Sequence, residues 1–208
     1  MKNVLILGDS IRVGYDKSIK KSLEGVANVL FPEENCRFAS FLLRHFHEYM
    51  RAFNGEKIDV IHWNAGLWDC LRLFGEEPHT PLEVYAYYIE RICIRMKKLA
   101  PRAKIIFATS TSVISEKMDP DFKRYNEEIE VYNKAAVEIA QKYGFAVNDL
   151  YKISSSLPES AHSDAVHYYT KEGTVPFAEQ TLRYISEALG IEAPVCKIVV
   201  HGEEAFGI

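Results

Sequence analysis

Short, continuously apolar runs alternate with longer amphipathic segments along the whole chain. The short runs predict five β-strands, at residues 3–7, 26–31, 58–63, 103–109 and 145–148. Continuously apolar strands that are separated by helices are typical of a parallel sheet with both faces covered. The pattern therefore predicts an α/β fold, a three-layer α/β/α sandwich around a central parallel five-stranded sheet.

Apolar residues recur at helical spacing in the segments between these runs. They predict helices at residues 10–23, 38–53, 81–99, 120–143 and 171–189. Thr80 and Pro81 have the character of an N-cap and a first helical residue, and Gly190 ends the last helix. We expect one domain over residues 1–190, followed by a tail over 191–208 whose KIVV stretch is compatible with an extra edge strand.

The composition is that of an ordinary globular protein, with 208 residues, 48% hydrophobic and 26% charged residues, and a formal net charge of -4. Scattered basic residues and a negative net charge argue against nucleic acid or a membrane as a partner. The first apolar run is too short for a secretory signal, and no run approaches the roughly 18 apolar residues of a membrane span. Four cysteines without metal-binding spacing then predict reduced thiols and a cytoplasmic location.

A serine follows the first predicted strand directly, in the stretch LILGDS that ends at Ser10. Ligands of doubly wound sheets collect at the carboxyl ends of the strands, and the first turn of a helix favours a developing negative charge. A serine at this place is either a helix cap or a nucleophile. Only a base on the same edge of the sheet distinguishes the two, because a hydroxyl is a weak nucleophile until its proton is removed.

A candidate base lies near the other end of the chain, in the stretch HSDAVHY before the last predicted helix. Asp164 and His167 are three residues apart, so that one turn lets the carboxylate hold one ring nitrogen while the other faces a serine. His162 is a minor competitor for the same role. A short Asp/His pair is weak evidence alone, but it gains weight in combination with a serine after the first strand.

Gly8-Asp9-Ser10 and Asp164-Ala165-Val166-His167 resemble the first and last sequence blocks of the SGNH or GDSL hydrolase family, in the same order and near the two ends of the domain. The resemblance implies a flavodoxin-like fold and an esterase-type acyl hydrolase. It also implies that Ser10 is the nucleophile, His167 the general base and Asp164 the residue that orients the histidine. It implies no metal and no organic cofactor.

The family builds part of its oxyanion hole from an asparagine in a G-x-N-D block after the third strand. Here the corresponding stretch is Gly66-Leu67-Trp68-Asp69, with Trp68 where the asparagine is expected. Asn64, two residues before Gly66, is the candidate substitute for the missing amide. Trp68 itself could line an acyl or sugar pocket.

The family's second block is also altered, because the stretch after the second strand, FPEENCRFAS, contains no glycine. We expect a backbone donor at Cys36 or Arg37 and a further side-chain donor at Asn35. Asp9 is expected to hold its loop through hydrogen bonds. Arg12 either contacts a carboxylate or phosphate of the substrate, or is solvated or paired with a glutamate.

The sequence thus predicts a serine esterase that removes short acyl groups, such as acetyl, from a carbohydrate or a small alcohol. The alternatives are a lysophospholipase or thioesterase type of acyl hydrolase, and a catalytically weak or silent binding protein with the same fold. The oligomeric state is not encoded in any pattern of the chain.

Overall fold

A central parallel sheet organises the computed structural model, which describes residues 1–54 and 57–202. The sheet has the strand order β2-β1-β3-β5-β7, and every neighbouring pair is parallel. Its strands are β1 (Lys2–Leu7), β2 (Ala27–Leu30), β3 (Val60–Trp63), β5 (Lys104–Ala108) and β7 (Ala146–Asn148). The predicted five-stranded parallel sheet is confirmed.

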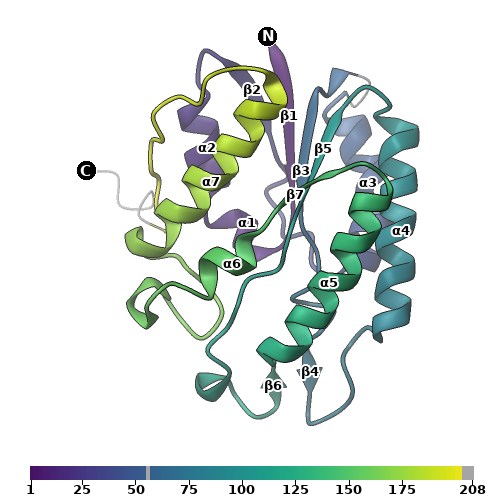
Figure 1. Ribbon diagram of the computed structural model, residues 1–208, viewed down its shortest axis with the longest axis vertical. Helices are drawn as coiled ribbons and strands as arrows, with labels where there is room; N and C mark the ends of the chain where they lie inside the picture. The colour runs from purple at the N-terminus through teal and green to yellow at the C-terminus, as the bar shows by residue number, and fades with distance from the viewer. Residues whose placement is uncertain (55–56, 203–208) are drawn as a thin grey trace.

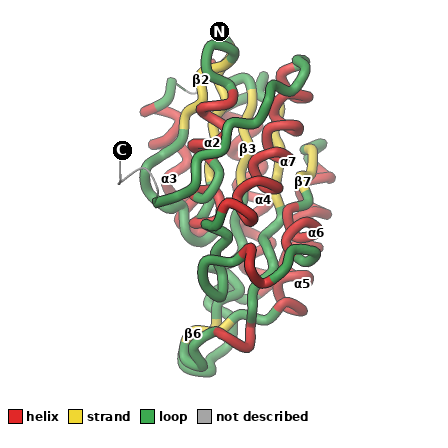
Figure 2. Tube along the Cα trace, turned by 90° about the vertical axis from the view of Figure 1, so that its left-hand side faces the viewer, coloured by secondary structure: helices red, strands yellow, loops and turns green. Residues whose placement is uncertain are grey.

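Helices cover both faces of the sheet (Figure 1). On one side lie α2 (Asp16–Ser22), which the short α1 (Ser10–Val13) precedes, and α7 (Lys171–Leu189), whereas α3 (Ala39–Ala52), α4 (Leu82–Leu99) and α5 (Asn126–Lys142) lie on the other. Figure 2 views the molecule from the side of α2 and α7. The three-layer α/β/α sandwich is therefore confirmed. Within the described part of the chain, no helix is both long and apolar enough to cross a membrane.

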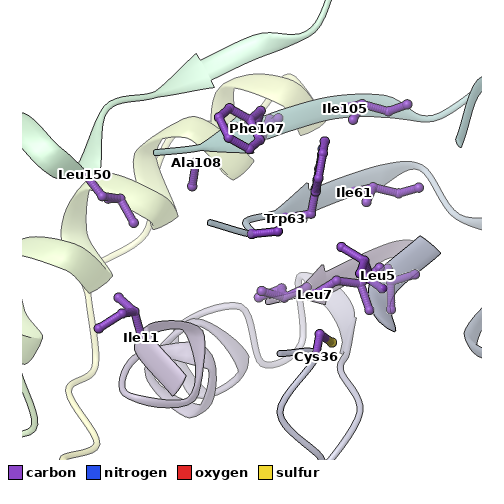
Figure 3. Close-up of a cluster of buried hydrophobic side chains, with 14 of the residues drawn as sticks. Leu5, Leu7, Ile11, Cys36, Ile61, Trp63, Ile105, Phe107, Ala108 and Leu150 are labelled. Atoms are coloured by element: carbon purple, nitrogen blue, oxygen red, sulfur yellow. The ribbon is translucent and has the colours of Figure 1, made fainter. Parts of the chain in front are cut away.

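The hydrophobic core around the sheet contains rows of buried side chains that run across neighbouring strands (Figure 3). In register, Leu7 of β1 lies beside Trp63 of β3, which lies beside Phe107 of β5. All three side chains are fully buried, and the Trp63 and Phe107 rings meet edge to face with 5.0 Å between centroids. This row lies at the carboxyl ends of β1 and β3 and one residue before the end of β5, and it supports the loops that follow these strands.

Two short strands that the sequence does not predict lie below the sheet in Figure 1, β4 (Arg72–Leu73) and β6 (Phe122–Lys123). They pair in antiparallel fashion, separately from the main sheet. The prediction of a helix from residue 120 is therefore wrong at its start. Residues 122–123 are extended because they pair with β4, and the helix begins only at Asn126.

Two other predicted elements differ. The helix over 10–23 is two helices, because the Gly14 N–H closes a tight turn on the Ile11 carbonyl before α2 begins. The tail is not an edge strand in its described part, up to residue 202, and residues 203–208 lie outside the described ranges. Instead it runs along α2, where the Ser18 hydroxyl bonds both the N–H and the carbonyl of Val199.

Candidate active site

Ser10 is presented by a strand-to-helix turn at the carboxyl end of β1. Asp9 is the N-cap of α1, and its carboxylate accepts the Ile11 N–H at 3.0 Å. Only glycine fits at position 8, since the Cβ of any other residue would lie 1.8 Å from the Asn64 Oδ1. The turn thus holds the half-buried Ser10 in the first turn of a helix, and Asp9 plays the loop-holding role that the sequence predicts.

The Asp164–His167 turn is closed by the aspartate itself. One carboxylate oxygen accepts the N–H groups of Val166 and His167 at 2.7 and 2.8 Å, and the other lies 2.7 Å from the His167 Nδ1. Partial burial raises the pKa of Asp164, but these hydrogen bonds outweigh it and hold the pKa below its usual range. The carboxylate is therefore ionised at neutral pH and accepts the Nδ1–H of His167, which fixes the tautomer of the ring.

The second ring nitrogen of His167 reaches the serine, with 2.7 Å between Nε2 and the Ser10 Oγ. With the proton of His167 held at Nδ1 by Asp164, Nε2 carries the lone pair that can accept the hydroxyl proton. The two residues are 157 positions apart in the chain. The structure thus brings together the serine, histidine and aspartate that the sequence nominates, in the order needed for proton transfer.

Tyr169 is a site residue that the sequence analysis missed. Its ring stacks on His167 with 4.8 Å between centroids, and its hydroxyl donates to the Ser10 carbonyl at 2.7 Å. The adjacent Tyr168 points elsewhere and bonds the carbonyl of Ser112. In the sequence, the two tyrosines after His167 are indistinguishable, and only their packing separates them. His162, the competing histidine, packs against Tyr168 with 4.0 Å between ring centroids rather than facing Ser10.

Asn64 lies directly after β3, buried against the catalytic loop. Burial raises the pKa of Asp9, whereas the Asn64 side chain, the Ile11 N–H and the charge of Arg124 lower it. Asn64 Oδ1 and the second Asp9 oxygen are buried without a hydrogen-bond partner within the described ranges. The Asn64 side chain thus lies against Gly8 in the turn that carries the nucleophile, and its service as an oxyanion donor stays a prediction.

The loop after β2 does not offer the predicted backbone donor. The Cys36 N–H, the expected donor, is already bonded to the Gly8 carbonyl at 2.9 Å. The Arg37 N–H is bonded to the Asn35 Oδ1 at 2.7 Å, and Arg37 adopts a left-handed φ of 50°. The prediction for Cys36 is therefore contradicted, because its N–H ties this loop to the catalytic turn. The Asn35 oxygen closes the local turn, and a role of its amide as a donor stays a prediction.

The altered G-x-N-D block is fixed in place by its last residue. Asp69 is fully buried, and its two carboxylate oxygens accept the Ala39 N–H at 3.0 and 3.2 Å. Burial raises the pKa of Asp69 to about 7. A Cβ at Gly66, whose φ is 149°, would lie 2.4 Å from the Ser110 hydroxyl, so that the glycine is required. The hydrogen bonds between Asp69 and Ala39 join the block to the start of α3.

Trp68, the residue in the asparagine's place, belongs to an aromatic group beside the site. It is half-buried and meets Phe38 edge to face at 5.6 Å, and Phe38 in turn stacks on His79 at 4.6 Å. The prediction that Trp68 lines an acyl or sugar pocket stays a prediction.

Arg12 is not available to a substrate, contrary to one of the predicted roles. Its side chain is 1% exposed, and its guanidinium donates to the Asp16 carboxylate and to the carbonyls of Pro32 and Glu34. The arginine therefore joins α1 to the loop after β2. Its pairing is with a buried aspartate rather than with a glutamate side chain.

Comparison with known proteins gives a consistent picture. No family model matches the chain. A GDSL esterase/lipase of Arabidopsis thaliana is 27% identical over 124 residues, which are 55% of this chain and 48% of the relative. One of Oryza sativa subsp. japonica is 26% identical over 124 residues, covering 55% and 47%. The chain thus matches about half the length of these curated relatives.

Solved structures extend the similarity to nearly the whole chain. An acetyl xylan esterase has a TM-score of 0.71 at 16% identity, covering 88% of this chain and 99% of the other. A lipase/acylhydrolase from Enterococcus faecalis has a TM-score of 0.72 at 17% identity, covering 96% and 100%. An acetylxylan esterase from Geobacillus stearothermophilus has a TM-score of 0.69 at 19% identity, covering 94% and 97%.

Such low identities show the fold alone, which this chain shares with these enzymes and with a putative GDSL-like lipase from Parabacteroides merdae. Together with the curated GDSL relatives, they confirm the predicted resemblance of this chain to the SGNH/GDSL family.

Proposed function

We propose that this protein is a carboxylic ester hydrolase with Ser10 as nucleophile. The observation that carries the proposal is the unbroken chain of contacts from Asp164 to His167 and from His167 to Ser10, each 2.7 Å long. Such an arrangement activates a serine hydroxyl at neutral pH, because the base is oriented and its charged form is stabilised.

In the proposed reaction the Ser10 Oγ attacks the ester carbonyl carbon while its proton passes to the His167 Nε2. The tetrahedral intermediate collapses as His167 returns this proton to the departing alcohol, which leaves an acyl group on Ser10. A water molecule then attacks the acyl carbonyl with His167 as base, and the acid departs as the proton returns to Ser10. Asp164 stabilises the imidazolium in both steps.

Short acyl groups on a carbohydrate or a small alcohol are the substrates we propose. The loop over 67–79 contains apolar residues that could receive a longer chain, but among them only Phe74 is turned outward, at 73%, whereas Leu67 and Leu71 are buried with 1% and 4% exposure. Several solved structures with this fold are named acetyl xylan esterases, which supports an acetylated sugar as the first compound to test.

A fluorophosphonate probe tests the nucleophile directly. We expect a covalent adduct on Ser10, found by mass spectrometry of the labelled peptide, and no adduct in Ser10→Ala or His167→Ala. Unlabelled Ser10 in folded wild-type protein would instead favour a catalytically silent binding protein.

The substrate class is tested with p-nitrophenyl esters of increasing chain length and with acetylated xylo-oligosaccharides. We expect kcat/KM to be highest for acetyl and to fall as the chain lengthens. A preference for long acyl chains would favour the lysophospholipase type, and faster cleavage of matched thioesters would favour a thioesterase.

A further inference from the structure

Arg124 is a buried arginine that the mechanism described so far does not use. It follows β6, is 3% exposed, and lies with its guanidinium carbon 5.2 Å from the centre of the Phe122 ring. Its Nε donates to the carbonyl of Leu67, the residue immediately before Trp68. The guanidinium is therefore fixed at the block in which the family's asparagine is missing.

The two terminal nitrogens of Arg124 remain available. Within residues 1–54 and 57–202, neither nitrogen has a hydrogen-bond or ion-pair partner. Neither nitrogen is fully enclosed by protein atoms of this region. The two nitrogens consequently reach accessible space. A buried cation without a carboxylate partner is costly, and such a cost is often retained where the charge has a function.

Arg12 shows what a structural arginine looks like in this protein. It is equally buried, but its terminal nitrogens bond one carboxylate and two backbone carbonyls. Arg124 uses only Nε to hold its position and leaves its N–H fork free. The two arginines therefore have different roles.

The charge of Arg124 acts on the turn that carries the nucleophile. Burial lowers the pKa of Arg124, an effect that Asp9 opposes, and the arginine in turn lowers the pKa of Asp9. Asp9 immediately precedes Ser10. An arginine stays protonated even under such burial, so that its free donors remain cationic beside the catalytic turn.

We propose that the terminal N–H groups of Arg124 bind the substrate carbonyl oxygen as it becomes an oxyanion, in place of the asparagine whose position Trp68 occupies. This inference rests on the proposed ester hydrolysis. An oxyanion hole needs donors aimed at the developing charge, and these can come from any part of the chain. The backbone donor predicted at Cys36 is less suited, since its N–H is already bonded to the Gly8 carbonyl, whereas Asn64 remains a second candidate that is tested separately.

The test compares Arg124→Gln and Arg124→Lys with wild type in p-nitrophenyl acetate hydrolysis, with kcat and KM measured separately. We expect kcat of Arg124→Gln to fall by about 10²- to 10³-fold, the usual effect of losing one oxyanion donor, while KM changes by less than about threefold. Arg124→Lys keeps the charge and should lose less. Arg72→Gln is the matched control, because Arg72 lies in the adjacent β4 and is paired with Glu128.

Chemical rescue separates a direct role from a structural one. Millimolar guanidinium chloride should restore part of the kcat of Arg124→Ala, and should have no such effect on Ser10→Ala or on wild type. Unchanged kcat in folded Arg124→Gln would overturn the inference and leave the proposed function standing. So would a rise in KM at constant kcat that is confined to acidic esters, because the arginine would then bind a ground-state anion. A wild-type protein without turnover and without Ser10 labelling would overturn both proposals.

Discussion

The two sides of the candidate site differ in how many of the groups expected from the sequence are in place. On the proton-transfer side, Asp164, His167 and Ser10 form a short chain in which both ring nitrogens have a partner. On the oxyanion side, the loop after β2 has no glycine and Trp68 replaces the expected asparagine. The backbone donor expected at Cys36 is also occupied by Gly8.

The difference reflects how strictly each task constrains the chain. Proton transfer needs one particular ring nitrogen within hydrogen-bond distance of one particular oxygen. Stabilising an oxyanion needs only N–H groups that point at the developing charge, and the backbone, an amide or a guanidinium can supply them. The oxyanion side can therefore be rebuilt without loss of the fold, and we expect variants of the two sides to differ in the size of their effect on kcat.

The largest expected effect comes from removing the base. His167→Ala should lower kcat for p-nitrophenyl acetate by on the order of 10⁶-fold, because Ser10 then keeps its proton. His162→Ala is the control, since the His162 ring packs against Tyr168 and not against Ser10. Equal losses in the two variants would show that the proton-transfer side is wrongly assigned.

Removing the orienting charge should cost less. Asp164→Asn places an amide opposite the Nδ1 of His167, which favours the wrong tautomer, and we expect a loss of about 10⁴-fold in kcat. Asp119→Asn is a matched control, because the Asp119 carboxylate closes a similar turn on the N–H of Asp121. A loss of less than about threefold in Asp164→Asn would contradict the assignment of Asp164.

On the oxyanion side, Asn64→Ala distinguishes the donor predicted from the sequence from the one inferred from the structure. If Asn64 donates to the oxyanion, kcat should fall about 10²-fold with little change in KM. Steady-state kinetics on folded variant protein provide the measurement. Unchanged turnover would eliminate Asn64 as an oxyanion donor and leave that role to Arg124.

A smaller effect is expected from Tyr169→Phe. The variant keeps the ring that stacks on His167 but loses the hydrogen bond to the Ser10 carbonyl. Since such a bond contributes about 0.5–1.5 kcal/mol, we expect kcat/KM to fall by about 3- to 10-fold. Tyr151→Phe, whose hydroxyl bonds Glu130 at the surface, should leave kcat/KM unchanged. If the two variants lose activity equally, Tyr169 has no positioning role.

Asp69 provides a test of stability rather than turnover. Its pKa of about 7 in the folded protein lies above the ordinary value of 3.8, so that the folded state binds this proton more tightly than the unfolded state. The stability from this group is present at low pH and is lost as the pH rises from about 4 to about 7.

Asp69→Asn should therefore make the free energy of unfolding less dependent on pH across this window, measured by urea denaturation at several pH values. Asp119→Asn, at an exposed turn, should retain the wild-type dependence. Identical pH profiles for wild type and Asp69→Asn would contradict the raised pKa.

Much of the fold follows from local patterns. Continuously apolar runs identify the five strands, and the last helix begins and ends at the predicted residues, with Gly190 in a left-handed conformation. The pairing of β4 with β6 was missed because each strand has two residues, too few for a period to emerge, and their partners are some 50 positions apart. The break after α1 was missed because the apolar spacing continues across Gly14.

In the candidate site, too, local turns could be predicted from the sequence, whereas contacts between distant segments could not. The sequence by itself determined the serine turn and the aspartate–histidine turn, because each depends on residues within three positions of one another. Only the tertiary structure decided that His167 reaches Ser10, that Tyr169 rather than Tyr168 supports them, and that Arg124 lies at the altered block. The physical reason is that a local turn is encoded by adjacent residues, whereas these contacts depend on how distant segments pack around the sheet.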